Sequence, residues 1–148
     1  MYDIIKFIHT YWAYLVLIIL VISTLNALIK FFGSKPFGPF DFRVSLFTLI
    51  VAHIQLLIGI VLFFVSPYFS YLTNTGIGNV MKDTALRSNI VEHPLTMIIA
   101  VIFITMGYSK HKKKLTSKAK FKSLAIFYTL ALVLVLAKIP WNVWFGVS

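Results

Sequence analysis

The sequence predicts an all-α membrane protein, a transmembrane four-helix bundle with antiparallel up-down topology. Of its 148 residues, 59% are hydrophobic and only 12% are charged, and the mean hydropathy is +0.91. Such a composition is typical of integral membrane proteins. A spanning helix needs about 20 apolar residues, and the chain contains four such runs with short joints between them. Residues 1–148 are therefore expected to form a single membrane domain.

The four predicted helices cover about residues 8–30, 40–66, 88–109 and 120–140. The first could instead be a signal peptide, but Asp3 and Lys6 precede it and no small-residue cleavage site precedes Lys30. Its apolar run also exceeds an ordinary signal core, so we expect it in the mature protein. Glycines and prolines at positions 33–39 then break the helix.

Prolines mark the remaining helix boundaries. Ser66-Pro67 ends the second helix, and Pro94 either kinks the third helix or occupies its first turn. The fourth helix closes at Pro140-Trp141, where an aromatic ring suits the membrane interface. Residues 72–88 form the one long polar joint, with a turn at its G-x-G sequence and a short interfacial helix expected over 80–88.

The distribution of basic residues predicts the orientation of the bundle. If the joints after the first and third helices are cytoplasmic, the inner side carries ten lysines and arginines and the outer side carries four. This asymmetry predicts a multi-pass protein of the bacterial inner membrane with both termini outside and a lysine-rich cytoplasmic joint at 110–120. Seven lysines at 110–122 then explain most of the net charge of +10. We expect them to contact anionic lipid and expect no nucleic-acid partner.

The four histidines occupy different environments in this topology. The chain has no cysteine, so histidine must supply most of the ligands of any metal or haem. His111 lies within a run of lysines and is predicted to be solvated or to face lipid headgroups. His53 lies ~15 Å into the membrane. His93 enters from the outer side directly after Glu92, and His9 lies at the outer boundary.

Two intramembrane histidines on consecutive helices of a four-helix bundle are what bis-histidine ligation of a b-type haem requires. We expect His53 and His93 to be the axial ligands, although their depths differ by ~9 Å. His9 matches the depth of His93 better and is the reserve ligand. Arg87 and Lys138 are the cations available to haem propionates, or else ordinary snorkelling anchors.

Each histidine has an alternative structural interpretation, because an intramembrane imidazole can simply hydrogen-bond to a neighbouring helix. On the third helix His93, Thr96, Ala100 and Gly107 recur at i, i+3, i+7 and i+14. This stripe of polar and small residues would let a neighbouring helix or a flat ligand approach closely. Glu92, the only glutamate, belongs to the same candidate site.

Several short motifs carry a resemblance that runs over nearly the whole chain. They are His53-x-Gln55-x3-Gly59, Ser66-Pro67, Met81-Lys-Asp83, Arg87-x4-Glu92-His93, Met106-Gly-Tyr-Ser-Lys110 and Ile139-Pro-Trp141. In these the chain resembles the small four-helix membrane proteins of Bacteroidota labelled cytochrome b-like, and in architecture it is distantly similar to one half of a haem A synthase. The resemblance implies bound haem. Tyr108 stands where the family pattern often has a histidine, which implies a single haem.

The expected function is that of a b-type cytochrome that binds one non-covalent haem b and transfers electrons as a component of a larger membrane complex. One alternative is a haem-free structural or accessory subunit. Another is a small metal- or proton-handling membrane protein that uses His9, His53, His93 and Glu92 as ligands or proton carriers. The chain has no Ser/His/Asp arrangement and no phosphate-binding loop, so an enzyme of the soluble type is not expected.

Overall fold

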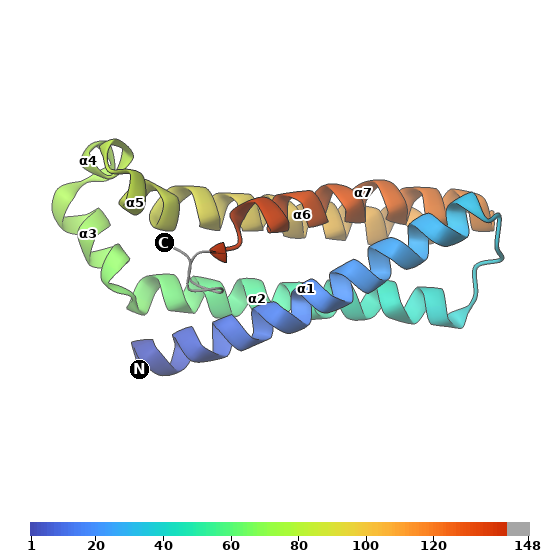
Figure 1. Cartoon of the computed structure of the whole chain (residues 1–148), viewed down its shortest axis with the longest axis horizontal. Helices are drawn as coiled ribbons and strands as arrows, with labels where there is room; N and C mark the ends of the chain where they lie inside the picture. Colours follow the sequence, from blue (N-terminus) through green and yellow to red (C-terminus); the bar gives the residue numbers. More distant parts are fainter. Residues whose placement is uncertain (142–148) are drawn as a thin grey trace.

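The computed structural model describes residues 1–141, and this part of the chain is helical with no strand. Four helical stretches are long and apolar enough to cross a membrane: α1 (Tyr2–Phe32), α2 (Pro39–Val65), Thr84–Lys112 and α7 (Ser117–Lys138). They run alternately in opposite directions (Figure 1), and the start of α1 and the end of α7 lie at the same end of the bundle. The predicted all-α transmembrane bundle is confirmed.

The third spanning stretch consists of three consecutive helical segments. It contains α5 (Thr84–Arg87), a π-helical turn over Ser88–Glu92 and α6 (His93–Lys112). Around the bundle, α1 packs on α2 and α7, and α6 packs on α7 and α2. The helices α1 and α6 therefore face each other across the diagonal.

Close packing between α6 and α7 depends on small residues. A Cβ added at Gly107 would lie 2.7 Å from Cβ of Phe127, so only glycine permits this approach. Ala100 is also buried, and the predicted packing stripe on this helix is confirmed at these two positions. The core around them combines small and large apolar side chains, among them Leu20, Ala27, Ala52, Ile104, Phe121, Leu124, Tyr128 and Ala131.

A buried acidic cap joins α1 to α2. Asp41, 3% exposed, accepts hydrogen bonds from the backbone N–H of Gly38 at 2.8 Å, from the amide of Asn26 at 2.8 Å and from the ammonium of Lys30 at 2.6 Å. The contact with Gly38 satisfies an N–H that the start of α2 leaves without a helical partner. The other two contacts anchor α1 to the same carboxylate, so one side chain fixes the geometry of the connection.

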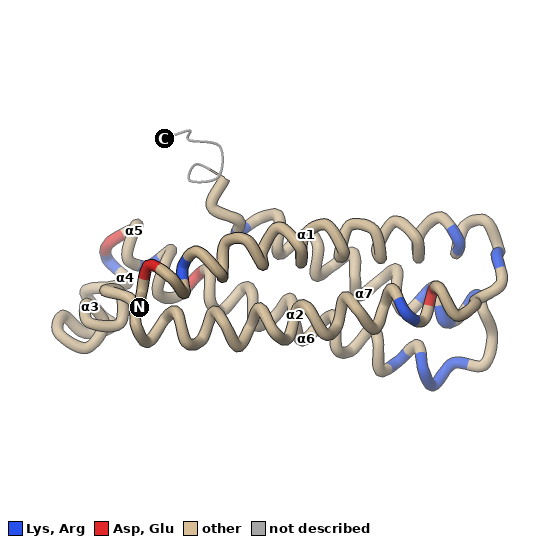
Figure 2. The backbone as a smooth tube through the Cα atoms, turned by 90° about the horizontal axis from the view of Figure 1, so that it is seen from below, with Lys and Arg blue, Asp and Glu red and all other residues tan. Residues whose placement is uncertain are grey.

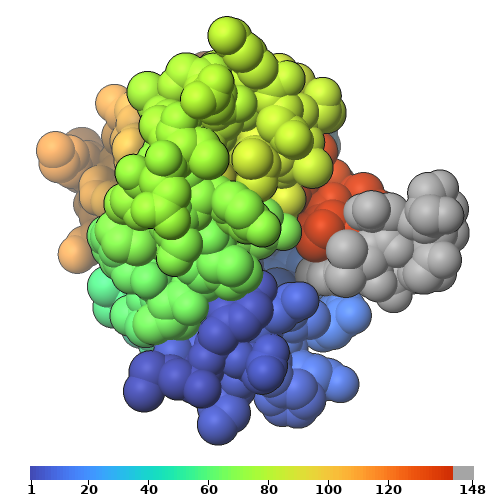
Figure 3. Space-filling view, turned by 90° about the vertical axis from the view of Figure 1, so that its left-hand side faces the viewer, coloured from blue at the N-terminus to red at the C-terminus, as the bar shows by residue number. Residues whose placement is uncertain are grey.

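The joint predicted at 72–88 is mostly helical. It contains the end of α3 (Pro67–Thr75), α4 (Ile77–Lys82) and α5, and Gly76 separates the first two with a positive φ of 82°. Asp83 interrupts the helix expected over 80–88, because its carboxylate accepts the N–H of Leu86 at 3.1 Å and caps α5. The segments from α3 to α5 spread over one end of the bundle (Figure 3).

The opposite end of the bundle carries most of the basic residues (Figure 2). There α6 continues to Lys112, and α7 begins at Ser117, so the non-helical part of the lysine-rich joint is only residues 113–116. Basic side chains in the last turn of α6 interact favourably with the helix dipole. Thr116 caps α7 by accepting the N–H of Ala119 at 3.2 Å.

Candidate functional site

His9 of α1 and His93 of α6 meet across the diagonal of the bundle. Their ring centroids lie 6.4 Å apart, and the ring planes form an angle of 77°. Both side chains are partly buried. The site lies at the end of the bundle that α3 to α5 cover, because α6 begins there.

The orientation of His93 is fixed by the end of α7. Its Nδ1 lies 3.0 Å from the carbonyl oxygen of Lys138, and since a carbonyl only accepts, Nδ1 must carry the proton and donate it. The Lys138 carbonyl is available because the last carbonyls of a helix have no partner within that helix. A neutral His93 therefore keeps the lone pair on Nε2.

His9 is fixed by two residues of α2. The side-chain amide of Gln55 donates to the backbone carbonyl of His9 at 2.8 Å. Gly59 faces the imidazole, since a Cβ added there would lie 3.3 Å from Cε1 of the ring. Nδ1 of His9 is buried and has no hydrogen-bond partner among the described residues. The ring is thus held by packing, with a polar atom still to be satisfied.

An ion-pair cluster adjoins His93. Glu92 accepts from Nε of Arg87 at 2.7 Å and from the ammonium of Lys138 at 2.9 Å, and Arg87 also donates to the carbonyl of Met81 at 3.1 Å. The π-helical turn just before His93 is a feature often found at functional sites. Lys138 therefore contacts the site twice, through its side chain to Glu92 and through its carbonyl to His93.

The structure does not bring His53 to His93. Nδ1 of His53 donates to the carbonyl of Leu49 at 2.8 Å, and Nε2 lies 3.4 Å from Oγ1 of Thr105. Thr105 is twelve residues after His93 on the same helix, which corresponds to ~18 Å along the axis. Two imidazoles that far apart cannot bind one iron, whereas the reserve ligand His9 lies beside His93.

Sequence reasoning missed Gln55 and Gly59 as residues of the site, although both stand in the His53 motif. They are four residues apart and so share one face of α2, while His53 points about 160° away from Gln55 around the helix. Because of this spacing, His53 and the face formed by Gln55 and Gly59 cannot both contact the same neighbouring helix. The face with Gln55 and Gly59 contacts α1.

His111 was predicted to be solvated or to face lipid headgroups, and this is wrong because the side chain is buried. It is 1% exposed, Nδ1 contacts the carbonyl of Tyr108, and Nε2 has no partner among the described residues. Its ring packs on those of Phe37 and Phe42, at centroid distances of 5.5 and 6.1 Å. His111 follows Gly107 by four residues and so lies on the same buried face of α6. The surrounding lysines in the sequence made this face difficult to recognise.

The site therefore offers two facing imidazoles and a neighbouring ion-pair cluster. Among residues 1–141 no group of three or more histidine, cysteine, aspartate or glutamate side chains is placed to hold a metal ion. Comparison with protein-family models, with curated proteins and with solved structures finds no significant match, so the functional assignment rests on the arrangement of the chain's own residues.

Proposed function

We propose that this chain is a membrane-embedded b-type cytochrome in which His9 and His93 hold one haem b. The observation that supports this proposal is the facing pair of imidazoles inside a four-helix membrane bundle. It replaces the expected pairing of His53 with His93 by the pair that the fold brings together.

The two imidazoles are close enough to hold one group between them. Their ring centroids lie 6.4 Å apart, and imidazole nitrogens are among the side-chain ligands that haem iron takes from proteins. Haem also needs only two protein ligands, because the porphyrin supplies the other four nitrogens.

The surroundings of His93 suit a ligand as well. Metal-binding histidines usually donate their second ring N–H to a carbonyl or carboxylate, which fixes the tautomer and the ring direction. The contact of Nδ1 with the Lys138 carbonyl has this form. Arg87 and Lys138 share the single carboxylate of Glu92, so the cluster keeps one excess positive charge that could attract a haem propionate.

Haem held by two imidazoles supplies one-electron transfer. His9 and His93 would hold the group, the Lys138 carbonyl would keep His93 oriented, and Gln55 would anchor the backbone of His9. A bundle of this size is best suited to pass electrons within a larger membrane complex, and we place it in the bacterial inner membrane.

The test is a reduced-minus-oxidised absorption spectrum of protein purified from haem-replete cells. We expect a Soret shift and a b-type α-band in the wild type. His9→Ala and His93→Ala should each lose most of the bound haem, because either change removes one axial ligand. His53→Ala is the matched control, since it removes another intramembrane imidazole, and it should keep the spectrum.

Two results would contradict the proposal in different ways. Loss of haem in His53→Ala together with retention in His9→Ala would overturn the ligand pair but not the cytochrome. A folded wild-type protein without any chromophore would overturn the cytochrome itself, and co-purification with a stoichiometric membrane partner would then favour an accessory subunit.

A further inference from the structure

Nearly all of the net charge of the chain lies at one end of the bundle. That end holds ten lysines and arginines and one acidic residue, Asp41, while the rest of the chain holds four basic and three acidic residues. Asp41 is buried and already paired with Lys30. The remaining nine cations of this end take part in none of the ion pairs within residues 1–141. No acidic side chain of the described residues therefore balances these nine positive charges, and they are left to attract anions from outside the bundle.

Three of these lysines line a groove between α6 and α7. The groove has a volume of about 360 Å³, and its lining includes Lys110, Lys114 and Lys122 together with Ser123, Ile126 and Phe127. It therefore combines a cationic rim, a hydroxyl and an apolar floor. The ammonium of Lys110 lies 6.0 Å from the ring centroid of Phe127, which holds that cation at the rim.

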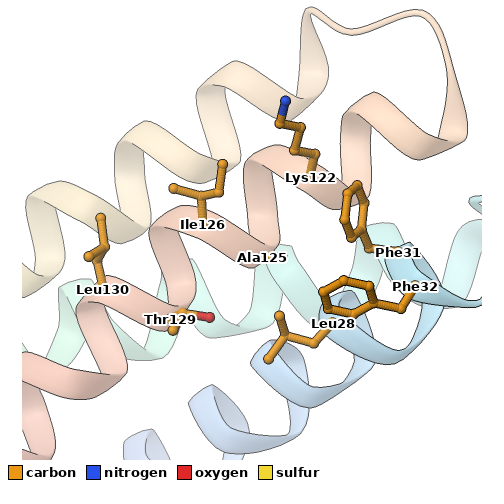
Figure 4. A pocket seen from close by; sticks show the side chains of 8 residues that line it. All are labelled: Leu28, Phe31, Phe32, Lys122, Ala125, Ile126, Thr129 and Leu130. Atoms are coloured by element: carbon orange, nitrogen blue, oxygen red, sulfur yellow. The ribbon is translucent and has the colours of Figure 1, made fainter.

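A second groove lies on the other side of α7, towards α1, and is apolar. Leu28 and Phe32 of α1 and Leu130 of α7 contribute to its lining (Figure 4). Lys122 and Ile126 line both grooves. The two depressions therefore flank a single stripe on α7.

This stripe begins at a lysine and continues with two apolar side chains. Lys122, Ile126 and Leu130 are spaced at i, i+4 and i+8, and Figure 4 shows their side chains on the same side of α7. From Lys122 to Leu130 the helix advances ~12 Å. Because α7 is apolar enough to cross a membrane, this direction leads from the lysine-rich surface towards the membrane centre.

We propose that this surface binds one anionic phospholipid. The phosphate lies among Lys110, Lys114 and Lys122, and the acyl chains follow Ile126 and Leu130 along α7. Lysines near a membrane surface attract anionic headgroups, and the apolar floor that continues from them fits a hydrocarbon chain. A free phosphate or a nucleic acid would use the cations alone and would leave the apolar stripe without a role.

The test counts phosphatidylglycerol molecules on the full chain by native mass spectrometry in a neutral detergent, with phosphatidylcholine as the zwitterionic comparison. The wild type should retain one phosphatidylglycerol in preference to phosphatidylcholine. Replacing Lys110, Lys114 and Lys122 together by glutamine should weaken that binding about 100-fold, from about fivefold for each lysine.

The matched control replaces Lys112, Lys113 and Lys118 by glutamine, which removes the same charge from the same end but from outside the groove. This control should bind almost as tightly as the wild type. Equal losses in the two triple variants would overturn the proposal, because the attraction would then be a general property of the basic end.

Two further measurements separate a lipid site from a phosphate site. Ala119→Phe keeps every lysine but fills the groove that Ala119 lines, and it should weaken lipid binding. Glycerol 3-phosphate at the lipid concentration should not displace the lipid, and displacement would overturn the proposal in favour of a phosphate site. The haem spectrum should be unchanged in all these variants, so failure here is distinct from failure of the cytochrome proposal.

Discussion

Replacing Gly107 by alanine should weaken the contact between α6 and α7. The added Cβ would lie 2.7 Å from Cβ of Phe127 and 3.2 Å from Cδ1 of Tyr128. Carbon atoms in favourable contact are about 3.5–4.0 Å apart, so the two helices would have to separate locally by roughly 1 Å. The Cβ of Phe127 is bonded directly to the helix backbone, so a change of side-chain rotamer does not move it and cannot relieve the contact. Overpacking of this kind costs about 1–3 kcal/mol.

Gly78→Ala provides the matched control for this substitution. Gly78 is also helical, but an added Cβ there meets nothing within 4 Å. Alanine gains about 1 kcal/mol of helix propensity at Gly107, inside α6, and less at Gly78, in the first turn of α4. The difference between the two variants is therefore a lower limit for the cost of the contact. We expect Gly107→Ala to have a free energy of unfolding about 1–3 kcal/mol lower than Gly78→Ala.

The assay is reversible unfolding in mixed micelles, titrated with sodium dodecyl sulfate and followed by circular dichroism. Equal unfolding free energies for the two glycine variants would refute the reasoning. That result would mean that α6 and α7 can move apart without loss, and that the small-residue stripe has no part in stabilising the bundle.

Three other predictions follow from the same structure. Gly59→Leu should place a branched side chain against the His9 ring and reduce the haem content of a folded protein. The measurement is the pyridine haemochrome absorbance per chain, and full haem content would argue against the proposed position of His9. Tyr128→Phe removes the buried hydrogen bond of 2.8 Å to the carbonyl of Ser45 and should cost about 1–3 kcal/mol in the same micellar unfolding assay. His111→Phe removes the buried, unpartnered Nε2 but also the contact of Nδ1 with the Tyr108 carbonyl. These two effects oppose each other, so the free energy of unfolding in the same assay should stay within about 1 kcal/mol of the wild type, and a larger loss would contradict the view that Nε2 has no essential partner.

Hydropathy and spacing predicted the fold class because a membrane leaves few choices. Every backbone polar group must be satisfied within the segment, so an apolar run of sufficient length becomes a helix. The packing role of Ala100 and Gly107 was predictable for a similar reason, since small residues at helical spacing mark a close contact. Local sequence was sufficient for both inferences.

The histidine pair depended on information that the sequence does not contain locally. Depth counting favoured His9 as the partner of His93, but the expectation that consecutive helices supply the ligands favoured His53. Only the order of the helices around the bundle shows that α1 faces α6. Asp41 was missed because a lone carboxylate near a glycine resembles an ordinary helix start, and its bonds to Asn26 and Lys30 come from another helix.

The position of Lys138 has a consequence for how the protein is assembled. His9 is in the first spanning helix and His93 in the third, but the carbonyl that orients His93 lies at the very end of the fourth. A nascent chain that has inserted only its first three helices thus has both imidazoles but lacks the group that fixes one of them. Completion of the site is therefore a late step of membrane insertion, and a ligand that needs both rings in their final orientation would select bundles whose last helix is already in place.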